Sequence, residues 1–229
     1  MNLNIPYLET DNKLLNDAYR IAAGDIVGNI VYYQNGLLTE EKPCMIAGLD
    51  YNTPWTRDTA INIWNALSIL SPEVSKNTLL AVLEEEEGSI YIGGQYWDSI
   101  IWMIGAREYC RFHKDDNFYR LAFEAGRNSV HRLEEDEFDE EDGLFRGPAV
   151  YGDGIAAYPD KYSKCPNQGS GILEWVDYPG NPVYPKGYGI PMKALSTNCV
   201  YFKAYEILAE MAHALGEPAK EFEEKAAAM

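Results

Sequence analysis

The residues that decide the fold are 52–60, Asn-Thr-Pro-Trp-Thr-Arg-Asp-Thr-Ala, in which a Pro-Trp turn precedes an Arg57–Asp58 pair. Pro54 cannot continue a helix from upstream, and apolar residues then recur at helical spacing. The pair therefore falls in the first turn of a predicted helix, where the helix dipole favours a negative Asp58. One interpretation is a simple helix start with an ion pair. The other is a binding role, because Trp55 stands beside the pair, and an aromatic face with an Arg-Asp fork suits a sugar ring.

Composition limits the classes of ligand. The 229 residues are enough for one large domain or two small ones, and an apolar content of 46% makes a substantial core possible. The aromatic share of 13% includes 17 Tyr and 5 Trp, which suit a cleft for a polar ligand with apolar faces. The formal net charge of −17 argues against nucleic acid and membrane surfaces as partners, because both bind clustered Lys and Arg. A neutral ligand is the better expectation.

The cysteines and the N-terminus indicate a compartment. The cysteines lie far apart without a C-x-x-C pair, which argues against a zinc ribbon or a dense disulfide framework. We expect free thiols at Cys44, Cys110, Cys165 and Cys199. The N-terminus lacks a basic region followed by an apolar run, and no stretch approaches about 18 uncharged apolar residues. The sequence therefore predicts a soluble cytoplasmic protein.

Hydrophobic periodicity predicts an all-α chain of antiparallel helical hairpins, with polar, aromatic loops at one end. The loop at 43–53 is expected to lead into the helix that carries the Arg-Asp pair, and the acidic run at 134–142 is expected to be a solvated helix end. Residues 143–189 form a long segment rich in Gly, Pro and Tyr, of the kind that is usually functional. The predicted helices cover residues 11–31, 56–70, 72–87, 95–113, 115–135, 192–215 and 219–229.

Four aspartates stand in aromatic or glycine-rich surroundings, which raise the pKa of a carboxyl and so suit a general acid. They are Asp58, Asp98 after Tyr96-Trp97, Asp153 in Tyr-Gly-Asp-Gly, and Asp177 between Trp175 and Tyr178. Asp177 is the best placed for this chemistry, and the alternative is an ordinary loop acid. We expect the loops that carry all four to open onto one cleft.

Other chemistries have weaker support in the sequence. His113, His131 and His213 fall on predicted helix surfaces and are too scattered for a metal site. Residues 169–171, Gly-Ser-Gly, do not form a nucleophile elbow, and no glycine-rich nucleotide-binding motif occurs. We therefore expect neither a metal nor a cofactor.

Five short motifs follow one another in an order that resembles the six-hairpin glycosidases, in their glycogen-debranching, trehalase and glucoamylase-like branch. They are Trp55-Thr56-Arg57-Asp58, Tyr96-Trp97-Asp98, Asp142-Gly143-Leu144, Glu174-Trp175-Val176-Asp177 and Ile190-Pro191-Met192-Lys193-Ala194-Leu195. The resemblance implies that Trp55, Arg57 and Asp58 hold the sugar of the cleaved unit. It also implies that Asp98 lies in the sugar subsite and that Asp177 is the general acid. Trp97, Asp153 and Trp175 complete the predicted substrate-binding set.

The resemblance implies a toroid of six helical hairpins, of which this chain supplies little more than half. No residue here matches the general base that many members carry in later hairpins. We therefore expect residues 1–229 to form one α/α-toroid domain that is truncated at its C-terminus. Half a ring leaves inner apolar surface, such as that around residues 97–104, without partner hairpins, so self-association is also expected.

The predicted function is hydrolysis of O-glycosidic bonds in an oligosaccharide, with inversion. Protonated Asp177 would donate to the leaving oxygen while a base activates water on the opposite face. The first alternative is a non-catalytic sugar-binding or assembly module that uses the same aromatic cleft. The second is an α/α-toroid sugar epimerase, which is disfavoured because that chemistry usually uses histidine as acid or base.

Overall fold

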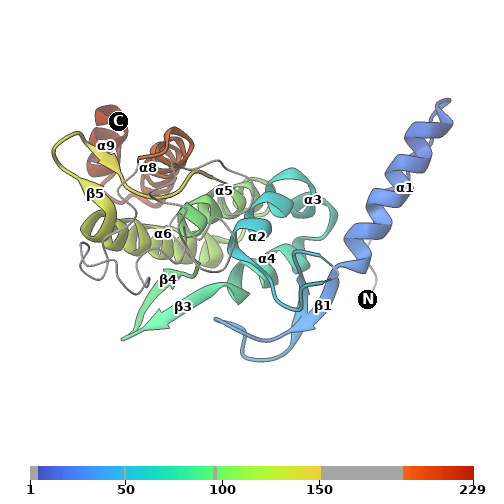
Figure 1. Cartoon of the computed structure of the whole chain (residues 1–229). Helices are drawn as coiled ribbons and strands as arrows, with labels where there is room; N and C mark the ends of the chain where they lie inside the picture. The colour runs from blue at the N-terminus through green and yellow to red at the C-terminus, as the bar shows by residue number, and fades with distance from the viewer. Residues whose placement is uncertain (1–4, 49, 95–96, 151–192) are drawn as a thin grey trace, which may run out of the picture. The chain divides into compact units, whose positions relative to one another are not determined.

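A computed structural model describes residues 5–48, 50–94, 97–150 and 193–229 (Figure 1). The described part of the chain is mostly helical and also contains three two-stranded antiparallel sheets. The chain divides into two compact units, Met1–Gly94 with Ile101–Ala125, and Gln95–Ile100 with Gly126–Met229. Helices α5 (Trp97–Phe112) and α6 (Asp116–Glu137) therefore contribute residues to both units.

The first unit begins with α1 (Lys13–Gly28), which confirms the predicted first helix. The Asn12 side chain caps it by accepting hydrogen bonds from the backbone amides of Leu14 and Leu15. Strands β1 (Ile30–Tyr33) and β2 (Lys42–Met45) then pair in an antiparallel hairpin, where a loop is predicted from residue 43 onward. That loop prediction is wrong at its start, because residues 43–45 are buried in the sheet.

Residues 56–70 form one helical stretch, built from α2 (Thr56–Asn62), the π-helical segment η1 (Ile63–Leu67) and α3 (Ser68–Leu70). Trp55 is the N-cap residue, and the Thr56 hydroxyl donates a hydrogen bond of 2.9 Å to the Gly93 carbonyl. Ser71 leaves helical geometry with φ −152°, and Pro72 opens α4 (Pro72–Ala81) at its first turn. The predicted helix and its end are both confirmed.

Helix α4 is shorter than predicted, because residues 83–92 form a hairpin instead of a last helical turn. Strands β3 (Leu83–Glu86) and β4 (Ser89–Ile92) pair through a turn in which Glu87 and Gly88 have φ of 51° and 81°. Glutamates are good helix formers, which is why periodicity favours a helix here. The β-branched and aromatic residues of β4, together with the Gly88 turn, favour the hairpin instead. The expectation of an all-α chain is therefore wrong, although most of the described chain is helical.

Helix α5 is the buried helix that its continuous apolar run predicts. Trp97 is 2% exposed, and Ile100, Ile101 and Met103 are also buried. The expectation that residues 97–104 present apolar surface without a partner is therefore wrong. Exposed apolar side chains occur on α1 instead, where no residue is buried; they include Leu14, Leu15, Ile21 and Val27.

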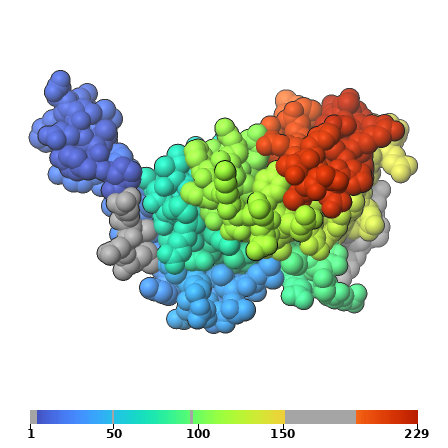
Figure 2. Space-filling model, turned by 180° about the vertical axis from the view of Figure 1, so that it is seen from behind, coloured from blue at the N-terminus to red at the C-terminus, as the bar shows by residue number. Residues whose placement is uncertain are grey.

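In its described residues, the second unit contains the first turn of α5, the C-terminal part of α6, one hairpin and two further helices. Helix α6 ends within the acidic run at 134–142, where Glu135 and residues 140–142 are exposed, as a solvated helix end predicts. The hairpin that follows was not predicted: β5 (Phe138–Asp139) pairs with β6 (Leu144–Phe145). The Phe145 ring stacks on Tyr201 of α8 (Leu195–Leu215) with a centroid distance of 3.6 Å. Gly216 adopts φ 72° and ends α8, after which α9 (Lys220–Ala228) packs back against it, as the red and orange residues show (Figure 2).

Gly105 sets the spacing between α5 and α2 in the first unit. A Cβ atom at this position would lie 2.8 Å from the Ala60 Cα atom. We expect Gly105→Ala to lower the free energy of unfolding by about 1–3 kcal/mol, the usual cost of overpacking. Urea denaturation measures the change. Gly24→Ala is the matched control, because its Cβ meets nothing within 4 Å in α1, and a loss equal to that of Gly105→Ala would contradict the close approach.

Candidate functional site

The start of α2 places an exposed aromatic pair beside two charges. Trp55 is 42% exposed, and its ring meets Tyr51 edge to face, with centroids 6.1 Å apart and planes at 77°. The next turn carries Arg57 and Asp58, whose Nε and Oδ2 atoms lie 3.8 Å apart. The Arg57 side chain is 15% exposed and that of Asp58 is 35% exposed. One helix start thus places an exposed aromatic pair next to a pair of opposite charges, and their role in binding a sugar stays a prediction.

The helix-start interpretation of the same residues also has structural support. Asp58 lies in the first turn of α2, where a negative charge interacts favourably with the helix dipole. The backbone of Trp55 accepts a hydrogen bond of 2.8 Å from the Thr59 amide, although its side chain does not cap the helix. A structural role in starting the helix and a binding role are therefore compatible.

The second predicted motif lies at the start of α5. Trp97 and Asp98 are 2% and 6% exposed, so this carboxylate is buried and the indole presents little surface. These two residues belong to the second unit, whereas Trp55, Arg57 and Asp58 belong to the first. The prediction that the four aspartate loops line one cleft stays a prediction.

The remaining predicted site residues, Asp153, Trp175 and Asp177, lie outside the described residues. The chain on either side of residues 151–192 is described, and its two ends meet. The Val150 amide donates to the Ser196 hydroxyl at 3.1 Å, and Gly147 forms a parallel bridge with Lys193. The Thr197 hydroxyl also donates to the Pro148 carbonyl.

A cluster of charges reinforces this junction. The Lys193 ammonium lies 2.7 Å from Asp139 Oδ2 and 2.5 Å from Asp142 Oδ2, and an Arg146 nitrogen lies 2.6 Å from the same Asp139 oxygen. The hydrogen bond from Lys193 lowers the pKa of Asp139, and the reciprocal bonds to Asp139 and Asp142 raise the pKa of Lys193. Asp142 and Lys193 come from two different predicted motifs, which the structure brings into contact.

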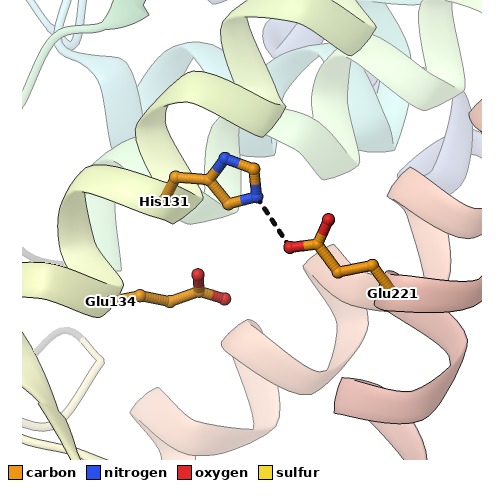
Figure 3. Close-up of side chains that lie close together, drawn as sticks. All are labelled: His131, Glu134 and Glu221. Atoms are coloured by element: carbon orange, nitrogen blue, oxygen red, sulfur yellow. Dashed lines mark hydrogen bonds and ion pairs between the residues drawn. The ribbon is translucent and has the colours of Figure 1, made fainter.

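A second polar cluster lines a cavity of about 640 Å³ in the second unit. His131 and Glu134 project from α6 and Glu221 from α9, and His131 Nε2 lies 2.9 Å from Glu221 Oε1 (Figure 3). One ligand atom from each of these three residues lies within 4.8 Å of the other two, close enough for one metal ion. This group was not predicted from the sequence, because the three histidines are scattered relative to one another and the carboxylate partners come from two helices. The His131-x-x-Glu134 spacing, one helical turn, is the signal that was available.

Lys225 and Tyr205 complete the second cluster. The Lys225 ammonium lies 2.7 Å from Glu134 and 2.6 Å from Glu221, and the Tyr205 hydroxyl donates to Glu134 Oε1 at 2.6 Å. Desolvation lowers the pKa of Lys225, but its hydrogen bonds to Glu134 and Glu221 outweigh this and hold the pKa above its usual value. Burial raises the pKa of Tyr205, so its hydroxyl keeps its proton. The hydrogen bond from Lys225 lowers the pKa of Glu221, which keeps that side chain charged.

Two of the described thiols lack the lowered pKa of an activated nucleophile. Cys44, Cys110 and Cys199 are free, as predicted, and Cys165 lies outside the described residues. Burial raises the pKa of Cys44 and of Cys110 to about 12. Neither of these two thiols is therefore ionised near neutral pH.

Comparison with known proteins does not identify a family. A scan against protein-family models found no match, and neither did searches of the curated proteins and of the solved structures. The case for a family therefore depends on the order of the motifs. Among the described helices, none has the length and apolar character that crossing a membrane requires.

The Lys193 cluster makes a prediction about pH. We expect Lys193→Met to lower the Tm at pH 7, because Asp139 and Asp142 lose their shared cation. A depressed pKa contributes stability above the ordinary aspartate value of about 3.9, and that contribution is lost as the pH falls through the folded-state pKa. The Tm difference between the variant and the wild type should therefore disappear in acid.

Thermal denaturation between neutral and acidic pH measures this difference. Lys203→Met is the matched control, because Lys203 pairs with Glu206 at 2.9 Å on the exposed face of α8 and such pairs contribute little. Equal Tm losses in the two variants, or a Lys193→Met loss that persists in acid, would contradict the account.

Proposed function

We propose that this chain belongs to a glycoside hydrolase that cleaves O-glycosidic bonds in an oligosaccharide. The observation that carries the proposal is the exposed Trp55 ring, paired with Tyr51 and followed by the Arg57–Asp58 pair. Such a ring stacks on the apolar face of a sugar, while the guanidinium and carboxylate bind vicinal hydroxyls. The motif order along the chain, which resembles the six-hairpin glycosidases, supports the same conclusion.

In the proposed reaction, protonated Asp177 donates to the leaving oxygen. A second carboxylate activates a water molecule on the opposite face of the sugar, which inverts the anomeric centre. Inverting enzymes place the two carboxyl groups about 6.5–9.5 Å apart to admit that water. Substrate contacts are assigned to Trp55, Arg57, Asp58, Asp98 and, by resemblance, to the rest of the predicted set. A neutral sugar also suits the net charge of −17 better than a polyanion does.

A non-catalytic sugar-binding module is the second candidate. It is favoured by the lack of any residue in this sequence that matches the family's general base. The same aromatic site would then hold a sugar without cleaving it. Binding of an oligosaccharide without turnover would distinguish this candidate from the hydrolase.

Asp177 gives the sharpest test of the hydrolase. Asp177→Asn should lower kcat by roughly 10²-fold or more on an oligosaccharide, whose leaving group is poor and needs a proton. An activated nitrophenyl glycoside needs less protonation and should lose much less. The quantity to measure is the ratio of the two losses, from steady-state kinetics on both substrates.

Asp58→Asn is the comparison variant, because Asp58 is assigned to bind hydroxyls and not to protonate the leaving group. Its losses on the two substrates should be similar, since a hydroxyl contact does not depend on the leaving group. If Asp177→Asn also loses activity equally on both substrates, the general acid is another residue, and Glu174 and Asp153 are the next candidates.

A further inference from the structure

The second cluster gathers a transition-metal donor set. His131 and Glu134 stand one turn apart on α6, and Glu221 comes from the first turn of α9. An imidazole nitrogen and two carboxylate oxygens are ligands that Zn²⁺ accepts, commonly with three protein ligands and one open position. The adjoining cavity of about 640 Å³ leaves room for a water molecule or a small ligand at the fourth position.

Two of the three donors are already oriented by neighbouring side chains. The His131 ring lies nearly parallel to the Phe222 ring, at 21° and with centroids 6.3 Å apart, and Phe222 is 2% exposed. The Tyr205 hydroxyl donates to Glu134 at 2.6 Å. Outer hydrogen bonds of this kind orient metal ligands, and their loss typically costs 10–100-fold in affinity.

In the structure, the Lys225 ammonium lies between the two carboxylates, where a metal ion would bind. It contacts Glu134 and Glu221, whereas His131 Nε2 lies against Glu221 Oε1. The Lys225 side chain is 33% exposed on a flexible stem, so it can move into solvent when a divalent ion enters. Lysine and metal therefore compete for the same two carboxylates.

We infer that His131, Glu134 and Glu221 form a site for one Zn²⁺ ion, which displaces the Lys225 ammonium and joins α6 to α9. The His131 imidazole makes the site selective for Zn²⁺ over Mg²⁺ and Ca²⁺, which prefer oxygen ligands. None of these three residues belongs to the proposed sugar-binding set, so the test of this site does not depend on the proposed hydrolase.

Isothermal titration of the full chain with ZnCl₂ tests the inference. Cys199→Ser serves as the background, because Cys199 is an exposed thiol that would bind Zn²⁺ on its own. One ion should bind per chain. His131→Ala should weaken binding at least tenfold, and Tyr205→Phe should weaken it about tenfold through the Glu134 carboxylate. Lys225→Met should strengthen it several-fold by removing the competing cation.

His213→Ala is the matched control. His213 also contacts α9, at 2.7 Å from Glu223, but belongs to no group of three donors in the described part of the chain. Its Zn²⁺ affinity should equal that of the background, and circular dichroism checks that each variant is folded. The inference is overturned if the background binds no Zn²⁺ or if His131→Ala binds as tightly as His213→Ala. It is also overturned if Lys225→Met weakens binding, or if Ca²⁺ binds as tightly as Zn²⁺.

Discussion

The second unit depends on the junction at which Lys193 meets Asp139 and Asp142. These ion pairs, the Gly147–Lys193 bridge and the Val150–Ser196 hydrogen bond hold the chain on both sides of residues 151–192 at one place. Ion pairs that share a partner in a network, as Asp139 and Asp142 share Lys193, hold position better than isolated surface pairs. The described residues that flank 151–192 are therefore held together between the β5–β6 hairpin and the start of α8.

The helices could be predicted because the residues that start and end them are local in the sequence and their apolar pattern extends over many residues. The Arg-Asp helix has both a Pro-Trp start and a Ser-Pro end, and α5 has an apolar run that leaves it little polar face. The hairpins could not be predicted in the same way, because each strand is stabilised by hydrogen bonds to a partner strand, which the spacing of apolar residues within one segment does not reveal. In β3 the glutamates favour a helix locally, and only pairing with β4 makes the strand favourable. In such segments, tertiary contacts determine whether a helix or a strand forms.

The candidate sites show the same difference between residues that are adjacent in the sequence and residues that only the fold brings together. Trp55 with the Arg57–Asp58 pair is visible from the sequence because its parts are adjacent, and the structure leaves the Trp55 ring exposed beside Tyr51. The second cluster brings together His131 and Glu221, which are 90 residues apart, so residue spacing alone does not reveal it. Likewise, the contact between Asp142 and Lys193 requires the folded chain, although each residue lies in a motif that the sequence singles out.

The most direct measurement is an NMR titration that follows the tryptophan indole signals while maltotriose, isomaltotriose or trehalose is added. If the exposed aromatic start of α2 holds the sugar, the signals of Trp55 and Trp175 shift together and saturate at one affinity. Trp64 is also exposed but is not assigned to the sugar site, and the buried Trp102 donates its indole hydrogen to the Leu79 carbonyl, so neither of these two signals should move. A Trp55 signal that stays unchanged with all three sugars, or a response confined to Trp64, would contradict the account.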